Sequence, residues 1–252
     1  MGGNVAISSV PEWGQRFYGS AGAGLASYDT YNGFFSVGVG NSTVQARVRY
    51  YVESAQNDFK FVNQAIPPFE EQRQQGADYF KHGGGADLFW NAGRKNYLSL
   101  HLWYHDSDRN IPPGMLYEGA GRRENQHDTD KRVSLRCNKN WARASSEFTA
   151  GVTLMQLDYF LEFETGIDPF VSIDSYSAMQ SWQAPYKFNY ILSARTPLQV
   201  KADARRHEAD LEDPRPGEGY AAAPTRLGAH AAAFHALGPG LPAFALLLVD
   251  LS

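Results

Sequence analysis

Apolar and polar residues alternate one by one along much of the chain. In residues 44–52 the even positions hold Val, Ala, Val, Tyr and Val, whereas the odd positions hold Gln, Arg, Arg and Tyr. Residues 97–105, 132–138 and 148–154 repeat this period of two. Successive side chains of a β-strand point to opposite faces, so the pattern predicts strands with one apolar and one polar face. Helical periodicity is nearly absent, and we expect an all-β fold.

The alternation predicts about eleven strands, many of them ten residues or longer. Their ranges are 16–26, 32–40, 43–56, 78–92, 96–106, 130–139, 145–162, 173–184, 186–204, 226–237 and 242–251. Strands of globular sheets typically have about five or six residues, whereas about 9–11 tilted residues cross a bilayer. The lengths suit a transmembrane barrel, but a soluble sandwich also has alternating strands, so strand pattern alone does not separate the two folds.

The connections between the predicted strands alternate in length. Short ones fall at 40–43, 92–96, 139–144, 184–186 and 237–242, and long ones at 57–77, 106–129, 163–172 and 205–225, with a modest first connection at 27–31. Outer-membrane barrels have short turns on one side and long loops on the other, a sorting that a sandwich does not require. Aromatic residues near strand ends, such as Trp90, Trp103, Tyr104, Trp141 and Trp182, suit interfacial girdles. The pattern therefore favours an antiparallel transmembrane β-barrel.

Composition removes several other classes. With 43% hydrophobic residues and a single cysteine, Cys137, the chain is neither disordered nor a disulfide scaffold. A net charge of −4 without a basic block argues against a nucleic-acid partner. The longest apolar run, residues 243–249, is far shorter than a membrane-spanning helix. The first residues lack the pattern of a signal peptide, so we expect no export signal in this sequence.

Four short stretches resemble TonB-dependent outer-membrane receptors. They are GGNVAI at 2–7, which is similar to the last strand of the plug of those receptors, LASYDTY at 25–31, QNDFKFVN at 56–63 and DRNIPPG at 108–114. Their order and their positions relative to the predicted strands carry the resemblance over residues 2 to about 236. It implies that residues 1–12 end a plug domain and that residues 13–252 form the first half of a barrel.

The resemblance implies a receptor for a scarce nutrient, such as an iron–siderophore, haem, vitamin B12 or a glycan. Such receptors have a 22-stranded barrel closed by a plug, lie in the bacterial outer membrane in contact with its lipid, and take energy from TonB through a segment near the N-terminus. Eleven strands are about half of that barrel, so we expect a truncated fragment that is open or imperfectly closed and not transport-competent alone. An open sheet in hydrocarbon leaves backbone groups unpaired at its two edges.

No catalytic motif is present, and we expect no enzymatic activity, no cofactor and no metal. The chain lacks a nucleophile elbow, a phosphate-binding loop and a zinc motif. The clusters at 105–108 and 127–130 contain His and Asp but lack the spacing of a calcium loop, so we interpret them as solvated loop residues. Asp158, Glu162 and Glu164 do not form a recognisable glycosidase pair. Cys137 shares the apolar phase with Leu135, which indicates a buried or lipid-facing thiol.

The polar phase supplies candidates for ligand binding. Arg47, Arg49, His101, Trp103 and Arg136 are expected to line the lumen as a basic and aromatic wall suited to an anionic chelate. Lumen residues of barrels also hydrogen-bond to one another and to a plug, which is the competing interpretation. We add the loop residues Arg109, Asp58 and Phe59, because receptors capture ligands from outside.

Two other hypotheses remain at this stage. The first is a soluble β-sandwich or jelly roll that binds carbohydrate through surface aromatics. The second is a small passive pore complete in itself, which the ending Asp250-Leu251-Ser252 disfavours because such barrels end in an aromatic residue.

Overall fold

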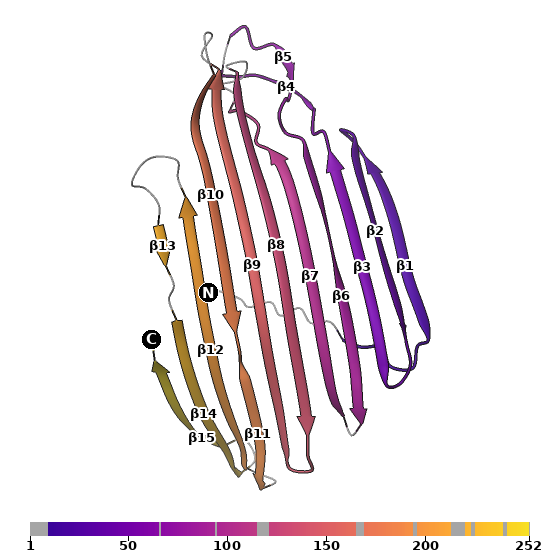
Figure 1. Ribbon diagram of the computed structural model, residues 1–252, viewed down its shortest axis with the longest axis vertical. Coiled ribbons are helices and arrows are strands. Elements are labelled where there is room, and N and C mark those ends of the chain that lie inside the picture. The colour runs from indigo at the N-terminus through magenta and orange to yellow at the C-terminus, as the bar shows by residue number, and fades with distance from the viewer. Residues whose placement is uncertain are drawn as a thin grey trace.

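The computed structural model describes residues 10–65, 67–93, 95–114, 121–164, 169–193, 196–212, 220–222, 225–238 and 241–251. These residues form one large antiparallel sheet whose strands lie side by side in a single layer (Figure 1). Within the described ranges, no helix has the length and apolarity needed to cross a membrane. The predicted end of a plug at residues 1–9 lies outside the described residues.

The strands follow one another across the sheet almost in chain order. Their bounds are β1 Phe17–Ala26, β2 Thr30–Gly40, β3 Val44–Ala55, β4 Lys60–Val62, β5 Glu71–Arg73, β6 Tyr79–Gly93, β7 Asn96–Asn110, β8 Arg122–Asn140, β9 Ala144–Glu164, β10 Pro169–Gln183, β11 Tyr186–Ser193, β12 Thr196–Glu212, β13 Tyr220–Ala222, β14 Thr225–Gly238 and β15 Leu241–Leu251. The order across the sheet is β1-β2-β3-β6-β7-β8-β9-β10-β12-β14-β15, and β4 and β5 form a separate hairpin. In the described part of the chain, the expected succession of about eleven strands is therefore confirmed.

The connections are sorted as the sequence predicts. The short connections after β2 and β8 lie at the lower end in Figure 1, where β6, β11 and β14 also end, and the long segment that carries β4 and β5 lies at the upper end. At the upper turn between β1 and β2, Tyr28 and Asp29 have φ of 63° and 52°, which matches the primed turns of two-residue hairpins. Among the described residues no second sheet packs on the first, so the sandwich hypothesis is wrong.

The predicted turn at 184–186 is wrong. β10 and β11 both pair with β9 on one side and with β12 on the other. They are therefore two parts of one continuous strand with a bend between them. Proline has no N–H, but the Pro185 carbonyl accepts from Thr149 N at 3.0 Å and Ala184 N donates to the Ala204 carbonyl at 2.8 Å. The ladder continues through the bend, and the predicted strand 186–204 is a hairpin made of β11 and the first half of β12.

Three predicted loops are shorter than expected, because strands continue into them. β7 runs to Asn110 and β8 starts at Arg122, so most of the predicted loop 106–129 is strand, with Asp106 opposite Thr129. In the same way β9 and β10 take up much of 163–172, and β12 extends to Glu212. In 106–110, 122–129 and 205–212 most residues on both faces are polar, so the sequence there lacks the apolar alternation that would identify strands.

The two faces of the sheet have opposite chemistry. We call the face that contacts residues 12–13 the inward face, and among its residues Gln45, Asp87 and Ser99 are buried although polar. The outward face carries Val48, Leu88, Leu102, Val133 and Leu154, which are each 40–50% exposed. Among the described residues only Ala55, Phe89 and Leu161 are buried and hydrophobic, so this sheet does not have the ordinary apolar interior of a soluble domain.

The last strand completes the described sheet. Residues 244–251 lack alternation in the sequence, but β15 pairs with β14 in an antiparallel register from Leu241 to Leu251, with one irregularity near Gly238. The departure in sequence pattern therefore does not interrupt the backbone ladder.

Candidate functional site

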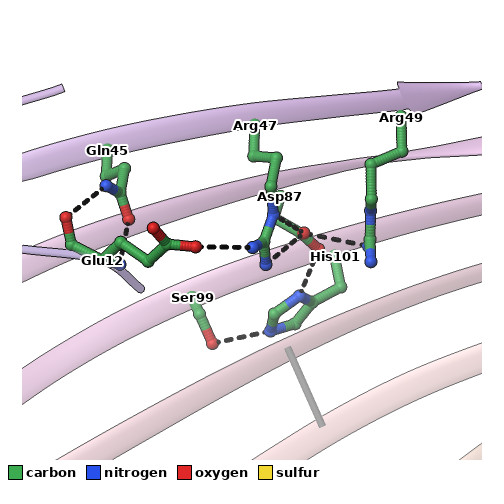
Figure 2. Close-up of polar contacts among 7 residues, drawn as sticks. All are labelled: Glu12, Gln45, Arg47, Arg49, Asp87, Ser99 and His101. Carbon is green, nitrogen blue, oxygen red and sulfur yellow. Dashed lines mark hydrogen bonds and ion pairs between the residues drawn. The ribbon is translucent and has the colours of Figure 1, made fainter. Parts of the chain in front are cut away.

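A buried carboxylate forms the centre of a polar cluster on the inward face. Asp87 lies on β6, and its side chain is 1% exposed. Arg47 and Arg49 from β3 donate to Asp87 Oδ2 at 3.1 and 2.9 Å, and His101 Nδ1 from β7 lies 2.7 Å from Oδ1 (Figure 2). Ser99 completes the cluster, because its hydroxyl lies 2.9 Å from His101 Nε2. The strand register places Arg47 opposite Asp87 and Asp87 opposite His101, so three neighbouring strands build the Asp87 cluster.

The charges of this cluster explain why Asp87 can be buried. A carboxylate removed from water is strongly destabilised unless cations and hydrogen bonds compensate it, and Asp87 has both. Two guanidinium groups share the Asp87 carboxylate, and Glu12 is a second carboxylate close to Arg47. Arg49 is 40% exposed, and Arg47 only 13%, so Arg49 offers the more accessible guanidinium.

A segment preceding the first strand lies against the same cluster. Glu12 N donates to Gln45 Oε1 at 2.6 Å, and Gln45 Nε2 donates to the Glu12 carbonyl at 2.8 Å (Figure 2). A Glu12 carboxylate oxygen lies 3.9 Å from Arg47 Nη1. The rings of Trp13 and Phe89 pack edge to face, with their centroids 6.5 Å apart. The inward wall therefore holds the chain before β1 by backbone, charge and aromatic contacts together.

An aromatic platform lies next to the Asp87 cluster, one row further up the same strands. Tyr51 and Trp103 stack with ring centroids 6.1 Å apart, and Tyr51 Oη lies 2.5 Å from His105 Nδ1. Their strands, β3 and β7, flank β6, where Gly83 and Gly85 carry no side chain between the rings. A Cβ on Gly83 would lie 2.8 Å from Tyr51 Oη and 2.6 Å from the Tyr104 carbonyl, so glycine is required for this approach.

A second polar group on the inward face lies near the upper strand ends. Tyr79 donates to Glu53 Oε1 at 2.5 Å, and Lys81 Nζ lies 2.9 Å from the same oxygen. The hydrogen bond to Glu53 raises the pKa of Tyr79 to about 12. The hydrogen bonds from Tyr79 and Lys81 lower the pKa of Glu53. The group is therefore a carboxylate held by two donors, the Tyr79 hydroxyl and the Lys81 ammonium group.

The remaining predicted binding residues are dispersed. Arg136 lies on β8 opposite Ser99, and its buried Nε has no hydrogen-bond partner among the described residues. Arg109 lies at the upper end of β7, 51% exposed and 4.0 Å from Asp128. It is a strand residue, so its predicted place in a loop is wrong. Asp58 and Phe59 do lie in a connection, where Asp58 pairs with Arg73 and the Phe59 ring meets Tyr28.

Sequence reasoning missed the residues that organise the inward wall. Asp87, Gln45, Tyr51 and Glu12 all contribute contacts, and none is among the predicted site residues. Asp87 shares the polar phase of a predicted strand with Gly83 and Gly85, which was a usable signal. What the sequence lacks is the register, because residues 57–77 separate the two strands and give no means of setting Asp87 opposite Arg47 rather than a neighbour.

The His and Asp clusters at 105–108 and 127–130 come together partly on the outward face. His127 Nε2 lies 3.0 Å from Asp106 Oδ2, Thr129 donates to the same oxygen at 3.1 Å, and His82 lies 3.7 Å from Oδ1. The hydrogen bond to Asp106 raises the pKa of His127. Burial tends to raise the pKa of Asp106, but the bonds from His127 and Thr129 lower it overall. Within the described residues no three such side chains converge on a point suited to a metal ion.

Comparison with known proteins identifies the fold. No protein-family model matches the chain, and no curated protein matches it. Among solved structures, the siderophore receptor PirA from Pseudomonas aeruginosa matches with a TM-score of 0.64 at 14% identity, over 95% of this chain and 38% of that one. The ferric yersiniabactin uptake receptor FyuA from Yersinia pestis matches with a TM-score of 0.53 at 10% identity, over 93% and 42%. The copper transporter OprC matches with a TM-score of 0.55 at 9% identity, over 96% and 47%.

These matches give the architecture of the chain. The proteins matched are transport receptors rather than enzymes, and the chain spans less than half the length of each of them. The curved antiparallel sheet therefore has the fold of part of the barrel of TonB-dependent outer-membrane receptors.

Proposed function

We propose that the chain is a membrane-embedded wall of a nutrient-uptake receptor of the bacterial outer membrane. The observation that carries this proposal is the inverted polarity of the sheet. Leucine and valine side chains are exposed on the outward face, whereas a carboxylate, a glutamine and a serine are buried on the inward face. A barrel in lipid has its apolar side chains outside and its polar side chains towards a wet lumen.

The height of the outward apolar surface supports a membrane position. On β8 the outward residues between the two lysines Lys139 and Lys131 are Cys137, Leu135 and Val133. Lys131 and Lys139 are eight positions apart, which is about 26 Å along the strand and about 20 Å of height at a tilt of about 40°. The long lysine side chains extend this stretch towards the apolar band of about 25 Å in such barrels. Trp141 lies at the lower border of this band and Tyr104, opposite Lys131, at the upper border.

The inward wall favours an anionic metal chelate as the transported nutrient. Arg49 offers a partly exposed guanidinium, and the adjacent platform offers Trp103, which is 36% exposed. Charge-assisted hydrogen bonds and stacking on an aromatic ring suit the anionic, often planar ligands of a chelated metal. One of the matched structures is a siderophore receptor and another is a ferric yersiniabactin uptake receptor, which is consistent with this choice. We propose that Arg136 and His101 support the ligand-binding side of the inward wall, and that Arg109 contacts the ligand at the outer end of the barrel.

The contacts of Glu12 and Trp13 support a plug on the N-terminal side. In this proposal residues 1–12 end that plug, residues 13–252 form the barrel wall, and energy for uptake comes from TonB through a plug segment. Plug movement would have to release the bonds between Glu12 and Gln45.

Membrane fractionation and ligand binding test the proposal together. The protein is expected in the outer-membrane fraction, with faster migration in unheated than in heated detergent samples. A ferric catecholate chelate is expected to quench Trp103 fluorescence, and Arg49→Gln to weaken this binding about tenfold, a loss of about 1.4 kcal/mol. Arg73→Gln, in the upper β4–β5 hairpin, is the matched control and leaves binding unchanged. A soluble protein without heat-modifiable migration would contradict the membrane proposal, and equal binding by the two variants would contradict the ligand site.

A further inference from the structure

Two methionines lie side by side on the inward face, two strands beyond the aromatic platform. Met155 on β9 is directly opposite Met179 on β10. Met155 is also opposite Asp130, which is opposite His105 beside the platform, so these side chains share one inward row. Directly opposed residues have Cβ atoms about 4.5–5.5 Å apart. The two thioether sulfurs can therefore reach one common point.

Both methionines are accessible, although the surface around them is polar. Met155 is 39% exposed and Met179 is 37% exposed. The inward residues next to them, one inward position lower on the same strands, are Thr153 and Ser181. Methionine usually fills gaps in apolar cores, and its sulfur is only a weak hydrogen-bond acceptor that gains little from water. An accessible pair of thioethers on a polar wall is therefore suited to a metal ion that prefers sulfur.

A histidine on the next strand adds a nitrogen ligand. Met179 lies opposite Ala209 on β12, and Ser181 lies opposite His207 on the same strand. His207 is therefore the diagonal neighbour of Met179 on the inward face, at a backbone separation of about 7–8 Å that long side chains bridge. His207 is half-buried, and no described residue forms a hydrogen bond or ion pair with it. Its ring is available to a ligand.

The charges beside these three side chains are already paired. Asp130 pairs with Arg132 on β8, and Asp203 Oδ2 lies 2.6 Å from Arg205 Nε on β12. Two thioethers and a neutral imidazole carry no charge of their own, which favours a monovalent ion. Mg²⁺ and Ca²⁺ require oxygen ligands, whereas thioether sulfur selects Cu(I) and imidazole also suits copper.

We propose that Met155, Met179 and His207 bind one Cu(I) ion on the inward wall. The two sulfurs and one imidazole nitrogen are its ligands, a set that differs from the sulfur-free His and Asp clusters of the outward face. The ligands lie on strands at least two removed from Trp103, so the ion site is separate from the proposed chelate site. The ion reaches it from the lumen, and the inference therefore rests on the proposed wet inward side.

Anaerobic titration of the full chain with Cu(I), after extraction from outer membranes in detergent, tests the inference. Bicinchoninate competes for the ion, and ascorbate keeps it reduced. All proteins carry Cys137→Ser, because thiolates also bind Cu(I). We expect the parent chain to take one Cu(I) from the competitor, and X-ray absorption of the loaded protein to detect sulfur and nitrogen neighbours.

Three variants remove one ligand each. Met155→Leu, Met179→Leu and His207→Gln are each expected to weaken Cu(I) binding at least about tenfold. The two leucine variants nearly conserve side-chain volume, so the wall is preserved. His127→Gln is the matched control, because it removes an imidazole from the outward face, and it is expected to bind Cu(I) like the parent chain.

The outcomes separate this inference from the proposed function. Heat-modifiable migration establishes that each variant is folded in the membrane form. A heat-modifiable parent chain that takes no Cu(I), or leucine variants that bind as tightly as His127→Gln, contradicts the ion site and leaves the receptor proposal intact. Cu(I) binding without quenching of Trp103 by the ferric chelate supports the ion site and contradicts the chelate site. Absence of any heat-modifiable form contradicts both proposals.

Discussion

At the residue scale, one buried carboxylate organises the inward wall. Asp87 accepts hydrogen bonds from Arg47 and Arg49 and contacts His101, and removing it leaves the two guanidinium charges without the carboxylate that they share. Breaking a buried ion pair by deleting one partner typically costs about 3–5 kcal/mol. We expect Asp87→Ala to lower the free energy of unfolding by about this amount, measured by urea titration in lipid vesicles.

An exposed ion pair is the control for this prediction. Arg109 is 51% exposed and 4.0 Å from Asp128, and such pairs contribute at most about 1 kcal/mol. Arg109→Ala is therefore expected to change the free energy of unfolding by less than about 1 kcal/mol. Equal effects of the two substitutions would show that Asp87 is not the centre of the wall.

The aromatic platform gives a second prediction at this scale. Gly83→Ala places a Cβ 2.8 Å from Tyr51 Oη, so the Tyr51 ring must leave its stack with Trp103. We expect a shift in Trp103 fluorescence and weaker binding of the chelate. Gly33→Ala is the matched control on β2, because the nearest atom to its Cβ is 3.7 Å away. Identical spectra of the two variants would contradict the platform.

At the element scale, the strands above the apolar band are stabilised by polar contacts instead of packing. His127 lies on β8 above Lys131, outside the band, and its hydrogen bond to Asp106 raises its pKa. A raised folded pKa stabilises the fold fully below the unfolded value of about 6.5, and this contribution disappears as the pH rises through the folded value. The upper β7–β8 ladder should therefore be more stable against local opening in mild acid.

Hydrogen exchange measures this effect. We expect protection factors of amides near the Asp106 and Thr129 pair to fall as the pH rises above about 6.5, relative to amides lower on the same strands. His127→Gln should abolish the pH dependence. A pH profile that is the same in the variant and the parent chain would assign the effect to other groups.

The observed strands also show which elements the sequence pattern predicts and which it does not. Val44, Val48 and Leu100 lie in strands where alternation is strong, and their predicted elements agree closely with β3 and β7. Asp106 and Thr129 lie in the upper parts of β7 and β8, which are polar on both faces, and alternation does not detect these parts. The turn predicted at Pro185 is wrong, because the sequence around a proline at a bend does not show whether its carbonyl continues a ladder. For the site, Arg47, Arg49 and His101 follow from phase alone, whereas their convergence on Asp87 depends on register.

At the scale of the whole molecule, the inverted faces predict opposite responses to added charge. Leu102 lies on the outward face at 43% exposure, two residues inside the upper border of the band. A lysine there would enter lipid at a cost between about 1 kcal/mol, the value near the interface, and about 2–4 kcal/mol, the value at the bilayer middle. Thr153 lies on the inward face, one residue beyond Val152. We expect Leu102→Lys to reduce folding into lipid vesicles and Thr153→Lys to leave it nearly unchanged. The reverse order would mean that the two faces have been assigned the wrong way round.

The only cysteine in the sequence provides the most direct measurement of the central claim. Cys137 is exposed on the outward face between Leu135 and Lys139. A spin label on Cys137 in lipid vesicles is expected to be relaxed by oxygen dissolved in the bilayer and to be protected from a water-soluble nickel reagent. A label at Ser134→Cys, on the inward face in a Cys137→Ser background, is expected to respond in the opposite way. Equal access of the water-soluble reagent to both labels would contradict a wall between lipid and a wet lumen.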